Sequence, residues 1–468
     1  MKKQIIIAFI VVIAFVISCS AQTTNDESLS AIEWIEKAID TIVKDNEVPA
    51  VVVALIKDGK VEKYISRGVL NRNTNNNADE NTMFQIGSLT KSFTGIIANN
   101  LINEGKLDVD ASITKYLPDS LSPKTKTKLQ PINVKDILHH RSGLPRDSKI
   151  VKRFGNDPMV CCYTEKDLLD DLEILELEFT PGEKSSYSNF GYGLLGYILE
   201  RASGKTYEEL LQTYVSQKLG LKNTTTIPSE SQKKLLATPY RKENRDYETK
   251  PFEMGKLVSA GGIYSTISDL SKLMTAQLAD YREFSGSRKD SVLMLTKHTK
   301  PFNDRLSYGY GMFVTNEGGY GHGGDVDGFA SGYTFIPENN IGVIFLTSSG
   351  GSWVGRFEDV IVGKLRDKPV RMPKARKTIS VPKEKLGRYT GKYVISESQI
   401  FNLVQNGKRL EVYIQESFGP ITLYFESENK LFAKTLNVEL EFEFDDTGKY
   451  SGVSGTLNGR KIEIRKIE

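Results

Sequence analysis

A serine and a lysine stand three residues apart in the stretch "FQIGSLTKSFTGIIANNL", residues 84–101. Residues three apart on a helix face the same way, so the Lys91 amine is expected one turn from the Ser88 hydroxyl. A serine hydroxyl becomes a nucleophile when a base takes its proton, and a lysine can be that base when burial or nearby positive charge keeps it neutral. A helix N-terminus adds backbone N–H groups that stabilise a substrate oxyanion. This arrangement is the one that nucleophilic catalysis by a serine needs.

The spacing of this pair carries little weight by itself. A serine N-cap followed by a solvated lysine explains Ser-x-x-Lys equally well. Four other serines in the chain also have a lysine three residues later: Ser112, Ser231, Ser380 and Ser427.

Two further motifs add the context that the pair lacks. Tyr187-Ser188-Asn189 is the one Tyr-x-Asn of the chain, and it stands in a polar turn just before a helical pattern. His322-Gly323-Gly324 is the one His-x-Gly, and it precedes a segment that reads as a strand. Taken singly, each also has a structural explanation: a buried tyrosine, a helix cap and a tight turn.

Together and in this order, the three motifs resemble those of the penicillin-recognising serine hydrolases. This superfamily comprises class C β-lactamases, D-alanyl-D-alanine carboxypeptidases, D-amino-acid peptidases and related esterases. The segments "DILHHRSGLP" at 136–145 and "SAGGIYSTISDLSKLM" at 259–274 are also similar to segments of that group. The likeness covers roughly residues 32–360.

The resemblance implies roles for the three reactive side chains. Ser88 is the expected nucleophile of an acyl-enzyme, and Lys91 its proton acceptor or the electrostatic support for one. Tyr187 is expected to relay the proton with a pKa lowered by two nearby cations. The division of work between Lys91 and Tyr187 stays open at this point.

The resemblance also implies a substrate-binding set. Asn189 is expected to donate its amide to the substrate's acyl carbonyl or to Lys91. His322 and Gly324 belong to the third motif, and the backbone N–H groups of Ser88 and Asp325 are the expected oxyanion hole.

The third motif departs from the pattern of many relatives. They carry lysine or histidine, then threonine or serine, then glycine, whereas Gly323 occupies the middle position here. A hydroxyl that could bind a substrate carboxylate is missing, at a cost of about 1–3 kcal/mol. His322 in place of lysine makes the positive charge there dependent on pH. We therefore expect an esterase or a D-amino-acid peptidase; a β-lactamase or D,D-carboxypeptidase is the alternative, and a catalytically silent binding or sensor protein the second.

The elements that position these motifs read as an α+β domain over residues 30–365. "AIEWIEKAIDTIVKD" has a helical apolar face, and "AVVVALIKDGKVEKYISRG" reads as a hairpin with Asp58 and Gly59 at its turn. Strand patterns return near the other end in "SGYTFIPE" and "IGVIFLTS". The two ends are expected to pair in one antiparallel sheet covered by helices, beside an all-helical region.

The remainder of the 468 residues points to a second domain. Residues 366–382 are basic and rich in proline, which is typical of a linker. From 383 to 468, short alternating segments separated by turns such as "DDTGK" predict a small antiparallel β-barrel. This part resembles the lipocalin-like modules appended to related lipoproteins, and we expect it to pack near the catalytic cleft and restrict substrate size.

The N-terminus reads as a processing signal rather than as fold. Two lysines precede the apolar run "IIIAFIVVIAFVI", which is short for a membrane span. "VISC" resembles the cleavage box of bacterial lipoproteins, so residues 1–19 form the expected signal and Cys19 the lipidated residue. The protein is then expected to be exported across the inner membrane and anchored to a membrane in the periplasm or cell envelope.

Composition excludes other classes of function. Sixty-two basic and 59 acidic residues leave a net charge of +3, which gives no electrostatic footprint for nucleic acid. The four histidines form no metal-ligand spacing, so His139 and His140 read as structural, and no metal or organic cofactor is implied. The adjacent Cys161 and Cys162 are expected to be ordinary thiols. A small-molecule, peptide or ester substrate is the expected partner, and the sequence does not specify an oligomeric state.

Overall fold

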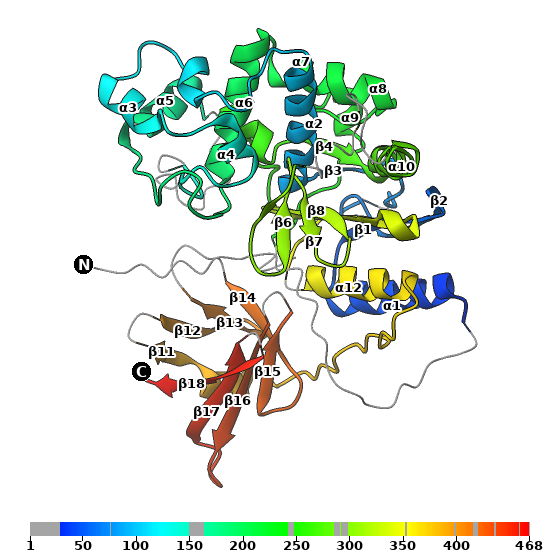
Figure 1. Cartoon of the computed structure of the whole chain (residues 1–468). Helices are drawn as coiled ribbons and strands as arrows, with labels where there is room; N and C mark the ends of the chain where they lie inside the picture. The colour runs from blue at the N-terminus through cyan, green and yellow to red at the C-terminus, as the bar shows by residue number, and fades with distance from the viewer. Residues whose placement is uncertain are drawn as a thin grey trace.

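The computed structural model describes residues 29–467, apart from 75, 149–162, 242–247, 285–290, 292–297, 352, 397–398, 415–419, 435–436 and 458. A layered α+β domain is followed by a smaller β domain, as predicted (Figure 1). Cys19, Cys161 and Cys162 lie outside the described residues. In the part of the chain described, no helix is long and apolar enough to cross a membrane.

The central sheet has eight antiparallel strands in the order β2-β1-β10-β9-β8-β7-β6-β5. Its strands are β1 Ala50–Lys57, β2 Lys60–Gly68, β5 Lys300–Pro301, β6 Leu306–Tyr308, β7 Phe313–Thr315, β8 Tyr320–Val326, β9 Phe329–Ile336 and β10 Ile341–Thr347. Val51 of β1 lies opposite Thr347 of β10, so the two ends of the domain pair as expected. The turn between β1 and β2 has positive φ at Asp58 and Gly59, which fits the twist of a two-residue hairpin.

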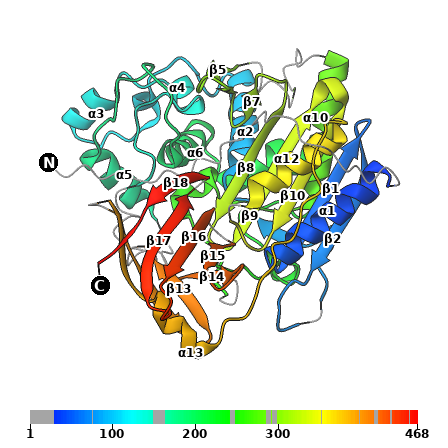
Figure 2. The ribbon, with the colours of Figure 1, turned by 90° about the horizontal axis from the view of Figure 1, so that it is seen from below.

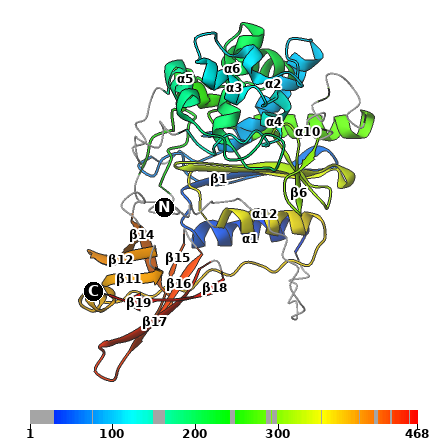
Figure 3. The same cartoon turned by 60° about the vertical axis from the view of Figure 1, so that its left-hand side comes forward.

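Helices cover both faces of this sheet, because its central strands are apolar on both sides. Alternate residues of β1, such as Val51 and Val53, pack under α1 and α12, while Val52 and Ala54 face the helical region. Figure 3 shows α1 and α12 on one side of the sheet and α2, α6 and α10 on the other, and Figure 2 shows α1 beside α12.

The helices within the described residues fall into two groups by length. The longer ones are α1 Ala31–Asp45, α2 Thr90–Asn103, α5 Glu165–Ile174, α6 Asn189–Ser203, α10 Ile267–Phe284 and α12 Trp353–Leu365. The shorter ones are α3 Pro123–Leu129, α4 Val134–Leu138, α7 Tyr207–Leu211, α8 Gln217–Leu219, α9 Glu230–Lys233 and α13 Lys383–Leu386. Two 3₁₀ turns, η1 Gly87–Leu89 and η5 Gly255–Ala260, and a short strand pair, β3 Met83–Gln85 with β4 Tyr264–Thr266, lie beside α2.

The C-terminal domain is a nine-stranded antiparallel sheet that almost closes on itself. Its strands are β11 Gly391–Ser396, β12 Gln399–Asn406, β13 Arg409–Tyr413, β14 Ile421–Phe425, β15 Lys430–Ala433, β16 Val438–Phe444, β17 Tyr450–Leu457, β18 Arg460–Glu463 and β19 Arg465–Lys466. β18 pairs with β17, and β19 pairs with β11 at the opposite end of the order, so the predicted barrel forms. Its interior is aromatic: the Tyr389 ring meets Phe425 and Phe442 edge-on.

The barrel contacts the catalytic domain at the turn between α1 and β1. Lys434 and Tyr424 donate to the Glu47 carboxylate at 2.6 and 3.1 Å, and the Arg376 backbone N–H donates to Asp45 at 3.0 Å. The Lys434 side chain is only 7% exposed, so this ion pair is enclosed at the contact.

The contact with the barrel and the third motif lie at the same end of the central strands. Asp325 at the end of β8 lies opposite Ala330, Ala330 opposite Thr347, and Thr347 opposite Val51. Because Glu47 lies three residues before the start of β1, the barrel is attached three strands away from the β8 strand that holds Asp325.

Candidate active site

Ser88 is the accessible point of a buried segment. It is the only residue from 82 to 99 that is not buried. It lies in η1, α2 begins at Thr90, and the N-cap residue Leu89 makes no side-chain cap bond. The explanation of Ser88 as a helix cap is therefore wrong, and Ser88 is the partly accessible residue of this segment.

Lys91 is fully buried and lies 3.1 Å from the Ser88 Oγ, as the helical spacing predicted. Its Nζ also donates to the Asn189 Oδ1 at 2.9 Å and to the Ala260 carbonyl oxygen at 2.6 Å. Burial lowers the pKa of Lys91 well below its ordinary value; Asp147 opposes this shift and Arg146 adds to it. A neutral amine is thus the favoured form.

The three partners of Lys91 are oxygens that can each accept a hydrogen bond from it. The Asn189 and Ala260 oxygens are acceptors only, so they take two of its hydrogens. In the neutral form that burial favours, the lone pair is left for the third partner, the Ser88 hydroxyl. This is the geometry of a base ready to accept the serine proton.

Tyr187 stands beside the pair, but its titration differs from our expectation. Its hydroxyl lies 3.4 Å from the His322 Nε2, and it also hydrogen-bonds Ser88. Burial raises the pKa of Tyr187 above the ordinary value of 10, although the Ser88 hydrogen bond and the Arg146 charge oppose the shift. The predicted lowered pKa is wrong, because one of the two supposed cations, Lys91, is itself held neutral. The raised pKa favours the protonated phenol, which can relay a proton, over a phenolate base.

His322 carries no charge near neutral pH. Burial lowers its pKa to about 3, against a hydrogen bond with Gly323 that raises it. Its Nδ1 lies 2.5 Å from the Gly323 carbonyl oxygen, which must accept, so Nε2 is left as an acceptor facing Tyr187. The expected pH-dependent positive charge is therefore wrong: His322 orients the phenol as a neutral ring.

Asn189 contacts Lys91 as an acceptor rather than as the expected donor. It opens α6, and its Nδ2 donates to the Asp147 Oδ1 at 2.9 Å, which turns its Oδ1 toward Lys91. Asp147 was not found from the sequence. Asp147 is the second residue after the quoted segment "DILHHRSGLP", and that proximity was the available signal.

Glycines bring the third motif against the first. A Cβ on Gly324 would lie 1.9 Å from the Ile86 carbonyl oxygen, and a Cβ on Gly87 would lie 2.8 Å from the Asp325 backbone nitrogen. Gly87 also has φ +54°, a conformation that favours glycine. Gly324 thus acts in packing, and the absence of both side chains places the Asp325 backbone next to Ser88.

His140 supports the second motif, a role that sequence reasoning described only as structural. It is 1% exposed, and its Nδ1 accepts from the Ser188 backbone N–H at 3.1 Å. Its ring lies 4.3 Å from the Tyr187 ring, centre to centre. Burial lowers its pKa well below 6.5, so it also stays neutral. His139 instead contacts the Tyr308 carbonyl oxygen through Nδ1.

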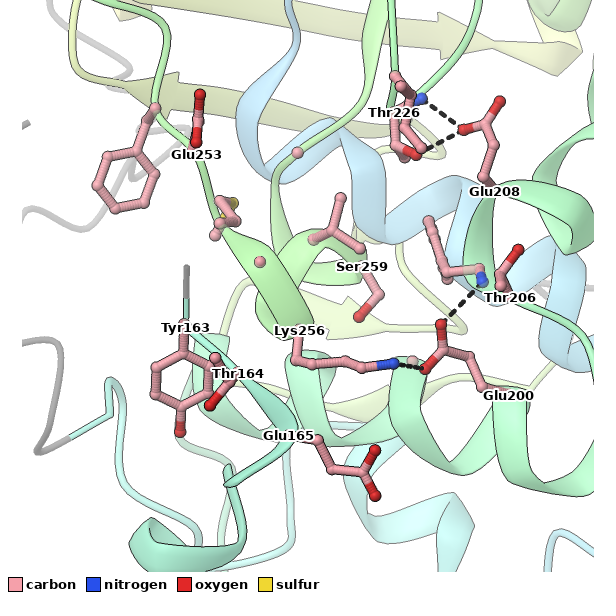
Figure 4. A pocket seen from close by; sticks show the side chains of 18 of the residues that line it. Tyr163, Thr164, Glu165, Glu200, Thr206, Glu208, Thr226, Glu253, Lys256 and Ser259 are labelled. Atoms are coloured by element: carbon pink, nitrogen blue, oxygen red, sulfur yellow. Dashed lines mark hydrogen bonds and ion pairs between the residues drawn. The ribbon is translucent and has the colours of Figure 1, made fainter. Parts of the chain in front are cut away.

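A separate cavity of about 610 Å³ lies behind η5 (Figure 4). Ser259 lines it, whereas the next residue, Ala260, directs its carbonyl to Lys91, so η5 separates the cavity from the catalytic pair. Two of its carboxylates have structural partners: Lys256 pairs with Glu200 at 2.7 Å, and the Thr226 backbone N–H donates to Glu208 at 2.6 Å. The cavity is not the site of the serine chemistry.

Comparison with known proteins identifies the fold and family to which this geometry belongs. Residues 35–363, more than half of the chain, match the family described as Beta-lactamase. The chain belongs to the beta-lactamase family. Its fold is shared with a solved relative, the octameric penicillin-binding protein homologue from Pyrococcus abyssi. That likeness covers 93% of this chain and 100% of the relative, with a TM-score of 0.62 and 24% identity.

Members of the beta-lactamase family with curated descriptions span several reactions. The D-alanyl-D-alanine-carboxypeptidase/endopeptidase AmpH of Escherichia coli K12 is 24% identical over 78% of this chain and 95% of its own length. A beta-lactamase of Providencia stuartii is 29% identical over 53% of this chain and 61% of its length. The teichoic acid D-alanine hydrolase of Staphylococcus aureus is 28% identical over 55% and 61%. Membership thus makes this chain a serine hydrolase of the family and leaves its substrate open.

Proposed function

We propose that this beta-lactamase family hydrolase cleaves an ester, amide or peptide bond through an acyl-enzyme on Ser88, as a related esterase or D-amino-acid peptidase does. The observation that carries the proposal is the Lys91 amine, buried, with its hydrogens committed to Asn189 and Ala260 and 3.1 Å from the Ser88 Oγ.

The reaction follows from these contacts. The Ser88 Oγ attacks the acyl carbon while its proton passes to the Lys91 Nζ. The backbone N–H groups of Ser88 and Asp325 stabilise the oxyanion. Tyr187, in contact with Ser88 and His322, passes the proton to the leaving group. Water then attacks the acyl carbon, and its proton passes through Tyr187 and Lys91 to the Ser88 Oγ. The bond between the acyl carbon and Ser88 breaks, the acid product leaves, and Ser88 is restored.

The third motif sets the expected class of substrate. Gly323 offers no hydroxyl, and His322 is neutral, so the carboxylate on the leaving group that a β-lactam or a terminal D-alanine carries has no charged partner there. We therefore place esters and D-amino-acid peptides ahead of penicillins.

The test is hydrolysis of p-nitrophenyl butyrate by residues 21–468, run beside Ser88→Ala. Turnover by the wild type that falls to background in Ser88→Ala supports the acyl-serine. Penicillin, added next as a competitor, measures the alternative of a β-lactamase or D,D-carboxypeptidase: complete inhibition with release of opened penicillin favours that alternative.

A silent binding or sensor protein is the competing proposal from another class. Such a protein is expected to have lost one of its reactive side chains, whereas Ser88, Lys91 and Tyr187 are all present and in contact. Retention of a radioactive penicillin without release, together with no ester turnover, would favour the silent form.

We also propose that the protein is anchored in the cell envelope by acyl chains on Cys19. This rests on the "VISC" pattern after the apolar run of the N-terminus. Labelling of the full chain with a fatty-acid probe, lost in Cys19→Ser, is the expected result; equal labelling of both chains removes the proposal.

A further inference from the structure

We propose that Arg146 recognises an anionic group on the acyl part of the substrate. The inference rests on the proposed acyl-enzyme function and names the chemistry of its substrate. It depends on where the Arg146 guanidinium lies, what it contacts and which other charges surround the site.

The Arg146 guanidinium lies at the mouth of the site, over the catalytic phenol. Its Cζ is 5.4 Å from the centre of the Tyr187 ring, and its side chain is 39% exposed. A planar guanidinium stacked on an aromatic face is fixed in orientation while its edge stays open to solvent. Arg146 can therefore meet a ligand that reaches Tyr187.

The fork of donors on Arg146 is only loosely engaged. Its Nε lies 3.7 Å from the Asp147 Oδ2, beyond hydrogen-bond length, and the Asp147 Oδ1 accepts from Asn189. Among the residues that the structure describes, its side chain has no other ion pair and no hydrogen bond. A guanidinium whose parallel N–H groups are available suits bidentate binding of a carboxylate.

Arg146 also supplies a positive charge to the site. Burial lowers the pKa of Lys91, His140 and His322 and so favours the neutral form of each side chain. A guanidinium keeps its charge throughout this range. Among the described side chains of the catalytic cluster, Arg146 is thus the one that can form an ion pair with an anionic substrate.

The position of Arg146 assigns the anionic group to the acyl side. The Arg146 carbonyl oxygen accepts from the backbone N–H groups of Asn189 and Phe190, so Arg146 is next to the second motif. The third motif, at which a carboxylate on the leaving group is expected, lies instead on β8. The absent hydroxyl at Gly323 therefore weakens binding of a carboxylate on the leaving group and leaves an acyl-side carboxylate unaffected.

A purely structural role for Arg146 makes a different prediction. If the guanidinium only stacks on Tyr187, its removal changes all esters alike. If it binds an anion, its removal changes the preference between an anionic and a neutral ester of the same length. The preference is thus the quantity to measure, because folding and Tyr187 effects cancel in it.

The test compares p-nitrophenyl hydrogen adipate with p-nitrophenyl hexanoate. Both acyl chains have six carbons, and only the adipate ends in a carboxylate. The ratio of kcat/KM values, adipate over hexanoate, is expected to fall about ten- to a hundredfold in Arg146→Met, as for loss of a charge-assisted hydrogen bond. Arg146→Lys, which keeps the charge and loses the fork, is expected to fall between the two. The Ser88→Ala chain provides the blank for spontaneous hydrolysis.

Arg201→Met is the matched control. Arg201 is exposed in the last turn of α6, roughly 18 Å along the helix from Asn189, and its removal takes away the same charge. The ratio is expected to stay at the wild-type value in this control. An equal ratio in wild type and Arg146→Met overturns the inference, and so does an equal fall in Arg201→Met, which would show a general charge effect.

A binding measurement separates failure of this inference from failure of the proposed function. In the Ser88→Ala background, p-nitrophenyl hydrogen adipate is titrated with and without Arg146→Met, and the quenching of tyrosine and tryptophan fluorescence is followed. Weaker binding in the double variant supports the role of Arg146 even if the wild type turns over neither ester. Equal affinities overturn it, whatever the turnover.

Discussion

The Nζ of Lys91 lies 2.6 Å from the carbonyl oxygen of Ala260, 169 residues further along the chain. This contact, with that to Asn189, fixes which way the Lys91 lone pair points. The base of the proposed reaction is therefore oriented by a distant backbone segment, η5, and not only by its own helix.

Replacing Lys91 by methionine is expected to lower kcat/KM for p-nitrophenyl butyrate by about 10²- to 10⁴-fold, the contribution of a general base. Methionine keeps the unbranched shape but cannot accept the Ser88 proton. Lys115→Met is the control, since that side chain is 58% exposed and pairs weakly with Asp108. Wild-type turnover in Lys91→Met would assign the base to another group.

The free energy of unfolding is expected to depend on pH through Lys91. The folded state holds this amine neutral, whereas the unfolded chain protonates it below about pH 10.4. The unfolded state thus binds one proton more, and stability rises with pH by about 1.4 kcal/mol per unit between the folded pKa and the unfolded pKa. Urea unfolding of wild type and Lys91→Met at pH 7, 8 and 9 isolates this slope; a constant difference would mean that Lys91 is charged when folded.

The pH–rate profile is expected to have one acid limb and no histidine inflection. The acid limb comes from Lys91, which must be neutral to act. His322 has a pKa of about 3 and His139 of about 4, so neither titrates between pH 5 and 8. The raised pKa of Tyr187 removes any fall up to pH 9. In His322→Gln the height of the profile changes but the midpoint of the acid limb does not; a shifted midpoint assigns that limb to His322.

The local part of the site could be predicted from the sequence, and the rest depended on tertiary packing. The distance between Ser88 and Lys91 follows from helix geometry alone, and the pairing of β1 with β10 follows from apolar strands at the two domain ends. The pKa shifts could not be predicted, because they come from burial by segments far apart in the chain. Tyr187 illustrates this: a nearby lysine indicated a lowered pKa until the structure showed that lysine to be buried and neutral.

Residues without a recognised motif were the ones missed. Arg146 and Asp147 follow a quoted segment but have no spacing that indicates chemistry. Ala260 contributes only its backbone, which no side-chain pattern reveals. His140 read correctly as structural, yet its contact with the Ser188 N–H shows which motif it supports.

The close approach at Gly324 is expected to make Gly324→Ala damaging. Its Cβ would lie 1.9 Å from the Ile86 carbonyl oxygen and 2.4 Å from the Ser331 Oγ, so the backbone must shift. We expect a loss of about 1–3 kcal/mol of stability. Activity should fall by about 10²-fold, because Asp325 moves relative to Ser88. Thermal unfolding and kcat/KM of the variant measure both effects.

Gly355→Ala provides the matched control for that substitution. No heavy atom lies within 4 Å of the added Cβ, and the residue is in α12, so stability should hold or rise by up to about 1 kcal/mol. Full activity in Gly324→Ala, at an unchanged melting temperature, would contradict the packing role of Gly324.

The docked barrel is expected to influence which acyl chains fit. Lys434→Met removes the enclosed ammonium that pairs with Glu47. It should loosen the contact between the barrel and the end of the central strands at which Asp325 also lies. The ratio of kcat/KM values for p-nitrophenyl octanoate and acetate should therefore change. Lys385→Met, whose exposed pair with Glu428 lies within the barrel, is the control. An unchanged ratio in Lys434→Met, and in a chain lacking residues 375–468, removes the idea.

The pairing of β1 with β10 also governs when the enzyme comes into being during synthesis. Val51 can pair with Thr347 only after Thr347 has been synthesised. At translation rates of 5–20 residues per second, the interval between the synthesis of these two residues is roughly 15 to 60 seconds. Ser88 and Lys91 leave the ribosome early, but Tyr187, Ala260 and Asp325 follow in turn. The proposed nucleophile Ser88 therefore lacks its full set of partners until most of the first domain has been made.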